Sequence, residues 1–195
     1  MSLIKSISGI RGTIGGKSGE GLTPLDAVKF AAAYATWLSG ETQTERPAIV
    51  LGRDARISGE MMEHLVAATL NGMGVDVISL GLATTPTVEM TVPNLEADGG
   101  IILTASHNPK QWNALKMLNC HGEFLTAEEG KVIIDLVERE DFTFSGVDEL
   151  GRMIRETGMD DYHIRRVLDL PLVNSGAIRK RGLRVVLDCV NSVGG

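Results

Sequence analysis

Short apolar runs alternate with longer segments of helical periodicity along most of the chain, and this alternation restricts the fold more than any other feature. Runs that suit buried strands, because they are apolar and too short for a helix, lie at residues 47–51, 75–80, 100–104 and 115–118. Apolar residues recur at helical spacing over residues 24–38, 59–73 and 126–137. Strands separated by helices of this length predict a three-layer α/β/α domain with a mainly parallel, mixed sheet.

Two of the predicted helices begin with capping signals. Thr23 is a good N-cap residue, Pro24 fits the first helical position, and Asp26 places an acid in the first turn. Thr126 and Glu129 have the spacing of a capping box, in which each side chain bonds the backbone N–H of the other residue. These signals predict where the two helices start.

Two loops of this predicted domain are candidate sites. In α/β sheets, ligands bind at loops beyond the carboxyl ends of the strands. Residues 52–59 and 105–113 follow predicted strands and carry charged and polar side chains. We therefore expect a functional site at this edge of the sheet.

The pattern changes in the last third of the chain. From residue 142 to 158 the periodicity weakens into charged, glycine-containing sequence, which predicts a linker. A helix over residues 161–170 and a strand over residues 184–188 are expected beyond it. We therefore divide the chain into a first domain, residues 1–150, and a second part, residues 151–195, that holds the linker and the start of a second α/β domain. Because a βα unit needs a helix after its strand, we expect that second domain to be incomplete.

Composition argues against several classes of partner. The formal net charge is −6, whereas nucleic-acid-binding surfaces are usually basic, so we expect no nucleic acid partner. No apolar stretch reaches the roughly 18 residues of a membrane span, and the amino terminus lacks the long apolar core of a secretory signal. The two cysteines, Cys120 and Cys189, are too few for a disulfide framework and lack metal-ligand spacing. We therefore expect a cytoplasmic protein with no membrane partner.

The most distinctive local sequence is Thr-Ala-Ser-His-Asn-Pro at residues 104–109. Small and polar residues at a strand end expose backbone N–H groups that suit an anion, and Asn-Pro forces the chain to turn. The same residues could also form a plain turn in which Ser106 and Asn108 only satisfy the backbone. On this segment alone the plain turn is the better interpretation.

Cationic side chains in other predicted loops change that balance. Arg11 lies in a glycine-rich loop, where backbone can approach a ligand closely. Residues 52–56, Gly-Arg-Asp-Ala-Arg, place two arginines and an acid just after a strand, and Lys116 lies on the predicted return strand after Ser106. Taken singly, each cation could be a helix cap, a weak surface ion pair or a solvated lysine. Together they predict a phosphate site, because the planar fork of arginine matches phosphate oxygens.

Several segments resemble the α-D-phosphohexomutases, the family of phosphoglucomutase, phosphomannomutase and phosphoglucosamine mutase. The matching segments, in the order that the family has them, are residues 8–12 (Ser-Gly-Ile-Arg-Gly), 52–56, 81–87 (Gly-Leu-Ala-Thr-Thr-Pro-Thr), 104–109 and 185–195. The similarity covers the whole chain, and the Ser-His-Asn-Pro loop is highly specific to the family. One departure is Ala114, where the family usually has glycine. Because alanine is less permissive of positive φ, we expect the local turn before Lys116 to differ.

The resemblance implies a four-domain enzyme that interconverts hexose 1-phosphate and hexose 6-phosphate through a bisphosphate sugar. In the active family members the serine matching Ser106 is phosphorylated, and Mg²⁺ binds this phosphoserine together with three aspartates of a second-domain loop. That loop and the motifs of the third and fourth domains are absent from this sequence. The resemblance therefore implies a fragment that is inactive alone and needs the missing C-terminal domains. Its parent is expected to use Mg²⁺ and a glucose 1,6-bisphosphate-type activator.

Within such a reaction, individual residues have candidate roles. Arg11 and Lys116 are the candidates to stabilise phosphate charge and to handle the proton of the serine hydroxyl. For Lys116 to act as a base its pKa must fall, which neighbouring cations would favour. His107 is expected either to orient the serine loop or to assist acid–base chemistry. The residues expected to support the loop around Ser106 are Arg53, Asp54 and Asn108.

Two other functional classes stay open at this stage. A serine hydrolase would pair Ser106 with His107, although adjacent side chains usually point apart and no Gly-x-Ser-x-Gly elbow is present. A non-catalytic phosphate-binding or interaction module would hold an anion without transferring it. The preferred hexose and the oligomeric state also stay open, because the family's sugar-selecting loop belongs to a domain that this sequence lacks.

Overall fold

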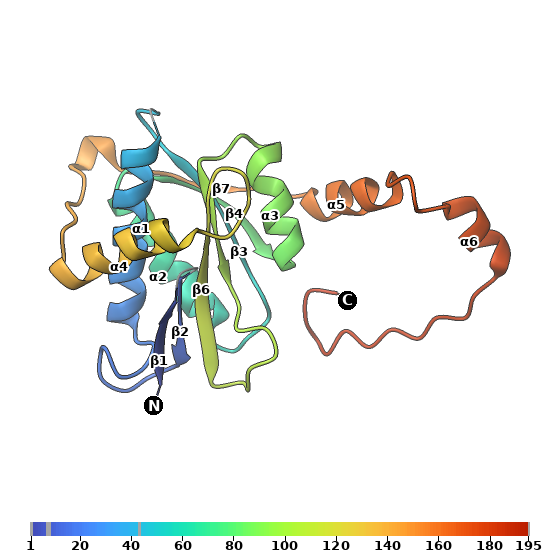
Figure 1. Cartoon of the computed structure of the whole chain (residues 1–195), viewed down its shortest axis with the longest axis horizontal. Coiled ribbons are helices and arrows are strands. Elements are labelled where there is room, and N and C mark those ends of the chain that lie inside the picture. The colour runs from blue at the N-terminus through green and yellow to red at the C-terminus, as the bar shows by residue number, and fades with distance from the viewer. Residues whose placement is uncertain (1, 7–8, 43, 195) are drawn as a thin grey trace.

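The computed structural model describes residues 2–6, 9–42 and 44–194 of the 195-residue chain, and these residues form a seven-stranded sheet with its helices (Figure 1). The strands are β1 (Leu3–Ser6), β2 (Gly9–Thr13), β3 (Ala48–Arg53), β4 (Asp76–Leu82), β5 (Gly99–Leu103), β6 (Trp112–Leu118) and β7 (Met153–Arg155). Their order across the sheet is β1-β2-β6-β5-β3-β4-β7. Strands β2, β3, β4, β5 and β7 point one way, and β1 and β6 point the other way. The predicted mainly parallel, mixed sheet is therefore confirmed.

Helices cover both faces of this sheet. The helices of the described residues are α1 (Pro24–Glu41), α2 (Gly59–Gly72), α3 (Thr85–Asn94), α4 (Ala127–Arg139), the 3-10 turn η1 (Val147–Glu149), α5 (Met159–Leu168) and α6 (Ser175–Arg181). α1, α2 and α4 pack on one face around the larger core, whereas α3 packs on the other face. The predicted three-layer arrangement is confirmed, and α5 and α6 lie beyond the layers (Figure 1). None of the helices in the described residues is long and apolar enough to span a membrane.

α1 and α4 begin where the capping signals predict. The Thr23 hydroxyl accepts a hydrogen bond from the Asp26 N–H at 3.4 Å, and the Asp26 carboxylate accepts one from the Thr23 N–H at 3.0 Å. Thr126 and Glu129 exchange the equivalent pair of bonds at 3.3 and 2.7 Å. Because these bonds satisfy N–H groups that have no partner inside the helix, they stabilise the first turn.

Alternate side chains of the central strands fill two separate cores. In β5, Ile101 and Leu103 belong to the larger core under α1 and α2, whereas Ile102 belongs to the smaller core under α3. Tyr34 of α1 is fully buried in the larger core, and its hydroxyl donates to the main-chain carbonyl of Leu118 at 2.7 Å. A strand buried on both faces needs apolar residues at every position, and β5 shows this continuous apolar pattern.

The two edges of the sheet differ from the sequence-based expectation. β1 and β2 form an antiparallel pair, so Arg11 lies in a strand and not in a glycine-rich loop. At the other edge, residues 153–155 of the predicted linker form β7, which pairs in parallel with β4. Met153 and Ile154 are 50% and 43% exposed, and a three-residue edge strand of this kind leaves no apolar run in the sequence.

The last part of the chain leaves the sheet (Figure 1). α5 contacts α3, and no residue of α6 is buried. The predicted strand at residues 184–188 is wrong, because these residues pair with no strand in the described part of the chain, and Val186 is 97% exposed. A strand needs a neighbour that satisfies its backbone N–H and C=O groups. The assignment of residues 151–195 to a second domain stays a prediction.

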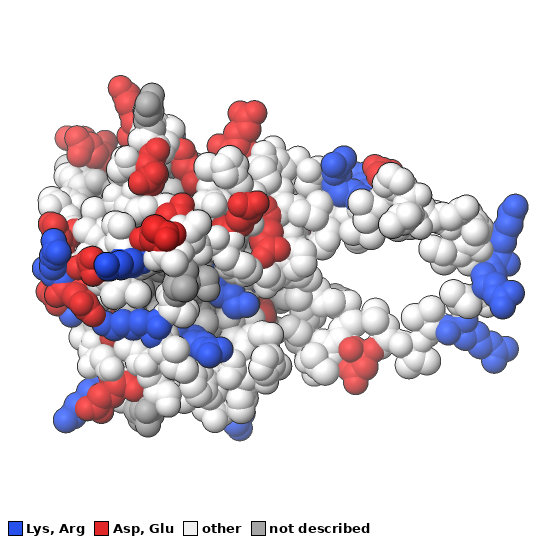
Figure 2. All heavy atoms as spheres, in the orientation of Figure 1, with Lys and Arg blue, Asp and Glu red and all other residues white. Residues whose placement is uncertain are grey.

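Acidic and basic side chains are interspersed over the sheet and its helices in the view of Figure 2. Basic side chains gather at the far end of the C-terminal segment, where the last turn of α6 holds Arg179, Lys180 and Arg181. Local clusters of cations therefore exist in a chain whose net charge is −6.

Candidate active site at the serine loop

The predicted serine site is the connection between β5 and β6, residues 104–111, which we call the serine loop. Ser106 is exposed, and its φ of 52° lies in the left-handed region, which residues other than glycine rarely adopt. Its N–H donates to the Thr104 hydroxyl at 3.1 Å, whereas its own hydroxyl makes no hydrogen bond to any described residue. The structure thus presents the Ser106 hydroxyl to solvent on a defined turn of the backbone.

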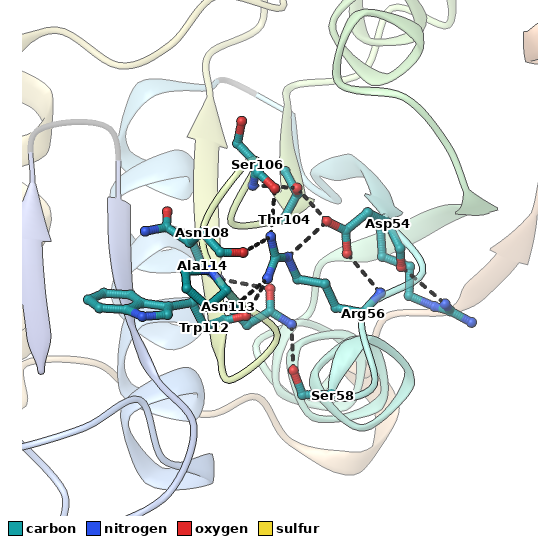
Figure 3. A network of polar contacts seen from close by, with 11 residues as sticks. Asp54, Arg56, Ser58, Thr104, Ser106, Asn108, Trp112, Asn113 and Ala114 are labelled. Atoms are coloured by element: carbon teal, nitrogen blue, oxygen red, sulfur yellow. Dashed lines mark hydrogen bonds and ion pairs between the residues drawn. The ribbon is translucent and has the colours of Figure 1, made fainter. Parts of the chain in front are cut away.

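Arg56, which follows β3, holds the serine loop by its backbone (Figure 3). Its Nε donates to the Asp54 carboxylate at 3.1 Å. Its two Nη groups donate to four main-chain carbonyls, those of Ser106 (2.6 Å), Asn108 (3.0 Å), Pro109 (3.0 Å) and Trp112 (3.0 Å). A guanidinium has five N–H donors, so every donor of Arg56 is used. Arg56 therefore has none left for a phosphate, and its contacts shape the loop instead.

Asp54 connects Arg56 to the beginning of the serine loop (Figure 3). Its carboxylate accepts hydrogen bonds from the Arg56 N–H at 3.0 Å and from the Thr104 hydroxyl at 2.6 Å. Because the same Thr104 hydroxyl accepts from the Ser106 N–H, a continuous chain of hydrogen bonds runs from Asp54 to Ser106. The side chains of Arg56 and Asp54 are 11% and 19% exposed, and this low exposure strengthens the ion pair between them.

Arg53 and Asn108, two further residues predicted to support the loop, also contact this network. The Arg53 Nε donates to Glu63 of α2 at 2.6 Å, and its Nη1 donates to the main-chain carbonyl of Asp54 at 3.3 Å. Asn108 offers its main-chain carbonyl to Arg56, and its N–H donates to a carbonyl earlier in the loop at 3.0 Å. The structure thus brings Asp54, Arg53 and Asn108 together around the backbone that carries Ser106.

Arg11 and Lys116 lie on the adjacent strands β2 and β6 and not in loops beside Ser106. Arg11 pairs with Ala114 and Lys116 pairs with Gly9, two positions further along. The residue pair between them belongs to the larger core under α1, so Arg11 and Lys116 point to the opposite face, which carries α3. Among the described residues, neither side chain has a hydrogen-bond or ion-pair partner.

Lys116 lies near an aromatic ring and an acid on this face. Its Nζ is 5.7 Å from the centroid of the Phe124 ring, which is within the range of a cation–π interaction. On α3, burial raises the pKa of Glu89 above its ordinary value, and the positive charge of Lys116 partly offsets that rise. The Lys116 ammonium therefore stabilises the charged form of a carboxylate on the neighbouring helix.

Three other expectations concern single residues. Ala114 lies within β6, where any residue can adopt the extended backbone, and a difference from the family in the turn before Lys116 stays a prediction. His107 is exposed, and its side chain makes no hydrogen bond to a described residue. Ser8, the first residue of one matching segment, lies outside the described residues.

Sequence reasoning counts Arg56 among the cations of a phosphate site and gives Thr104 no separate role, although both hold the serine loop in the structure. One signal was available, because Asp54 is followed two residues later by an arginine, and Asp side chains commonly bond the N–H at that spacing. This spacing predicts a local turn. It does not predict the carbonyl partners of Arg56, which lie 50 to 56 residues further along the chain.

The described residues contain no group of three or more His, Cys, Asp or Glu side chains arranged to hold a metal ion. At the serine loop the nearest carboxylate is that of Asp54, and it already accepts hydrogen bonds from Arg56 and Thr104. The Mg²⁺ that the resemblance implies therefore does not find a complete set of ligands in this part of the chain.

Comparison with known proteins identifies the family. The family model described as phosphoglucomutase/phosphomannomutase, alpha/beta/alpha domain I, matches residues 3–144, which is well over half of the chain. The chain belongs to the phosphoglucomutase/phosphomannomutase family. The matched residues of this phosphohexomutase domain include β1 to β6, the four helices that cover them and the whole serine loop.

Related family members match over almost the whole chain. A phosphoglucomutase/phosphomannomutase of Thermococcus kodakarensis is 37% identical over 187 residues, which are 94% of this chain and 40% of that protein. A phosphoglucosamine mutase of Mesorhizobium japonicum is 35% identical over 185 residues, 92% of this chain and 40% of that protein. A crystal structure of a family protein from Burkholderia thailandensis shares the fold with a TM-score of 0.69 at 23% identity, over 86% of this chain and 36% of that one. The chain thus spans about 40% of the length of the curated relatives it matches.

Proposed function

We propose that the chain is the serine-bearing domain of a phosphohexomutase and that Ser106 carries the phosphoryl group. The observation behind the proposal is the serine loop, in which Arg56 holds four carbonyls while the Ser106 hydroxyl faces solvent. A phosphoryl carrier needs a fixed hydroxyl that a substrate can reach, and this arrangement meets both needs. The names of the related proteins support a hexose phosphate as the substrate class.

In the proposed reaction, phosphoserine 106 donates its phosphoryl group to a hexose phosphate. The bond between phosphorus and the Ser106 oxygen breaks as a bond to a sugar hydroxyl forms, which gives a bisphosphate sugar. After the bisphosphate sugar reorients, its other phosphate is transferred back to Ser106, and the isomeric hexose phosphate leaves. A base must accept the proton of the attacking sugar hydroxyl, and a proton must be given to the Ser106 oxygen as it leaves. Lys116 is our candidate for that base, and His107 is our candidate to orient the loop or assist the proton transfer.

The phosphate on Ser106 needs nearby cations. It carries about −1.5 to −2 charges at neutral pH. Arg56 cannot neutralise it directly, since all five of its donors are used. We therefore propose that Arg11 and Lys116, which share one face of the sheet, stabilise the charge of the phosphate during its transfer to and from Ser106.

The rest of the parent protein would complete the site. Because the chain spans about 40% of the length of its relatives, we propose that further domains close the cleft and select the sugar. The Mg²⁺ ligands other than the phosphate on Ser106 are assigned to those domains. The 195-residue chain by itself is then expected to show no mutase turnover, and a cytoplasmic location remains our expectation.

The test is the replacement Ser106→Ala in the parent protein. Turnover of a hexose 1-phosphate in the presence of glucose 1,6-bisphosphate should be abolished, and intact-mass spectrometry should find no phosphate on the variant after the same incubation. Ser39→Ala is a matched control, because the Ser39 hydroxyl bonds only a carbonyl of its own helix, α1. Substantial turnover by a correctly folded Ser106→Ala protein would refute the proposal.

Two further measurements test the alternative functions. A non-catalytic phosphate-binding or interaction module would bind inorganic phosphate in a titration without any mass increase on Ser106. A serine hydrolase would react with a fluorophosphonate label at Ser106. Within the described residues no hydrogen bond joins Ser106 to His107, so the pair that a hydrolase would need is not formed.

A further inference from the structure

Glu63 is a buried carboxylate on α2 that no step of the proposed reaction uses. It is 8% exposed, and both of its oxygens have partners: Oε2 accepts from the Arg53 Nε at 2.6 Å and Oε1 accepts from the Ser79 hydroxyl at 2.7 Å. Burying an ion pair is costly, and apolar residues of similar volume often serve a fold as well. The buried charge therefore calls for an explanation other than stability.

Arg53, the partner of Glu63, reaches toward the serine loop with the other end of its guanidinium. Its Nε bonds Glu63, and its Nη1 bonds the main-chain carbonyl of Asp54 at 3.3 Å. Because the guanidinium is planar and rigid, fixing Nε also fixes the direction of Nη1. The side chain packs closely under the first turn of α2, where a Cβ on Gly59 would lie 3.3 Å from the Arg53 Cδ. The pair thus has little room to adopt another arrangement.

Asp54 connects Arg53 to Ser106 through hydrogen bonds. Its carbonyl is held by Arg53, while its carboxylate holds Arg56 and the Thr104 hydroxyl, which in turn accepts from the Ser106 N–H. Every link in this chain is a hydrogen bond of 3.3 Å or shorter between groups that are at least partly buried. A change at Glu63 is therefore transmitted to the backbone of Ser106 without an intervening flexible segment.

We propose that Glu63 is a positioning residue for Ser106, acting through Arg53 on the turn that holds the serine loop. The importance of this position for catalysis rests on the proposed function of Ser106 as the phosphoryl carrier. The structural effect on the loop does not depend on that function, so the two can be tested separately.

Ser79 supplies a comparison on the other side of Glu63. Its hydroxyl donates to Glu63 of α2 at 2.7 Å and accepts from the Gly81 N–H of β4 at 3.2 Å. Ser79→Ala therefore removes a bond from Glu63 without touching Arg53 or the serine loop. If Glu63 served only to stabilise the fold, Ser79→Ala and Glu63→Gln would affect the same amides.

The experiment measures amide hydrogen exchange by NMR in the purified 195-residue chain with Glu63→Gln. Glutamine keeps the size of the side chain but removes the charge that orients Arg53. We expect the amides of Ser106 and Asn108 to exchange at least tenfold faster, relative to the amide of Ile102 in β5. The matched control is Glu60→Gln, which removes the same charge from an exposed position one turn earlier in α2 and should change neither.

Two outcomes would overturn the proposal. In one, the exchange rates of the loop amides and of the Ile102 amide rise by the same factor, as a general loss of stability predicts. In the other, the loop amides do not change. Should the Glu63→Gln chain fail to fold, Arg53→Lys decides the matter, because lysine keeps the charge beside Glu63 but cannot also reach the Asp54 carbonyl. With Arg53→Lys the loop amides must show the same selective acceleration, and unchanged exchange would refute the inference.

The exchange measurement is independent of phosphoryl transfer. If Glu63→Gln loosens the loop but Ser106→Ala leaves mutase turnover intact in the parent, the proposed function fails and the positioning effect stands. If the loop is unaffected but Ser106→Ala abolishes turnover, only the inference about Glu63 fails. In a parent that passes both tests, Glu63→Gln should lower kcat at least tenfold with little change in KM, because the sugar is bound by other residues.

Discussion

Replacing Arg56 by lysine should loosen the serine loop without unfolding the domain. Lysine keeps the positive charge, but its ammonium has three donors on a single nitrogen, whereas arginine has five donors on three nitrogens. A single ammonium cannot reach the Asp54 carboxylate and four carbonyls at once. Arg56→Lys therefore loses at least two of the five bonds that hold the loop.

The magnitude follows from the number and environment of the lost bonds. A hydrogen bond to a charged group contributes about 1.5–3 kcal/mol. The Arg56 side chain is only 11% exposed, so water replaces these bonds poorly, although some of the carbonyls belong to exposed residues and can be hydrated. We expect the free energy of local loop opening to fall by about 2–4 kcal/mol, which corresponds to roughly 25-fold to 700-fold faster exchange of the Ser106 amide.

The assay is amide exchange by NMR together with urea unfolding of the same chain. The unfolding free energy should fall by no more than the opening free energy of the loop, because the bonds lost on local opening are also absent from the unfolded chain. Arg46→Lys is the control, because the Arg46 Nε lies 3.8 Å from Asp76 and its Nη2 donates to the main-chain carbonyl of Leu150 at 2.8 Å, so neither contact involves the serine loop. The exchange of the Ser106 amide should not change in this variant. If the Ser106 amide is as protected in Arg56→Lys as in the unchanged chain, the reasoning about Arg56 is refuted.

Three further predictions concern the stability of the fold. Tyr34→Phe removes a buried hydroxyl that donates to a β6 carbonyl at 2.7 Å, and it should lower the urea unfolding free energy by about 1–3 kcal/mol. Gly99→Ala places a Cβ 2.1 Å from the Tyr34 hydroxyl and should cost about 1–3 kcal/mol, whereas Gly40→Ala, with open space around it, should be neutral or slightly stabilising in the same assay. Burial by itself would raise the pKa of Asp26, but hydrogen bonds, chiefly from Thr23, outweigh it and hold the pKa below its ordinary value. Because the folded-state pKa is lowered, the stabilisation is present above the unfolded pKa of about 3.9 and is lost as pH falls through the folded pKa. Thermal unfolding against pH should therefore show the advantage of the unchanged chain over Asp26→Asn shrinking below about pH 4; an advantage that grows there would contradict this sign.

Local patterns in the sequence were sufficient for the central strands of the sheet and for α1, α2 and α4. The starts of α1 and α4 follow from Thr23 and Thr126, because a capping box involves residues only three positions apart. The continuous apolar run at residues 100–104 predicted a buried strand, because such a run is also a pattern of residues that are close along the chain. The sheet edges were harder. β7 consists of three exposed residues inside the predicted linker. The segment at 184–188 has an apolar pattern but no neighbouring strand in the described residues. The predictions from pattern alone were therefore wrong for both segments.

The candidate site also has some features that the sequence predicts and others that only the structure shows. Its motif at residues 104–109 and the acid at Asp54 are visible in the sequence, since both follow predicted strands. Arg11 was expected in a glycine-rich loop and Lys116 on a return strand, and only the register of β2 against β6 shows that their side chains share a face of the sheet. Register depends on which strands become neighbours, and no local pattern encodes that choice.

The sequence by itself therefore determined the class of fold, the starts of α1 and α4 and the residues that make up the serine loop, because those properties depend on residues that are close along the chain. The tertiary structure decided which charges are already paired. From the sequence, Arg56 is a candidate phosphate ligand. In the structure, one of its five donors bonds Asp54, and the other four bond carbonyls of residues 50 to 56 positions further along the chain. A guanidinium binds whatever acceptors folding places around it, and those acceptors are main-chain groups that every residue carries and no sequence pattern distinguishes.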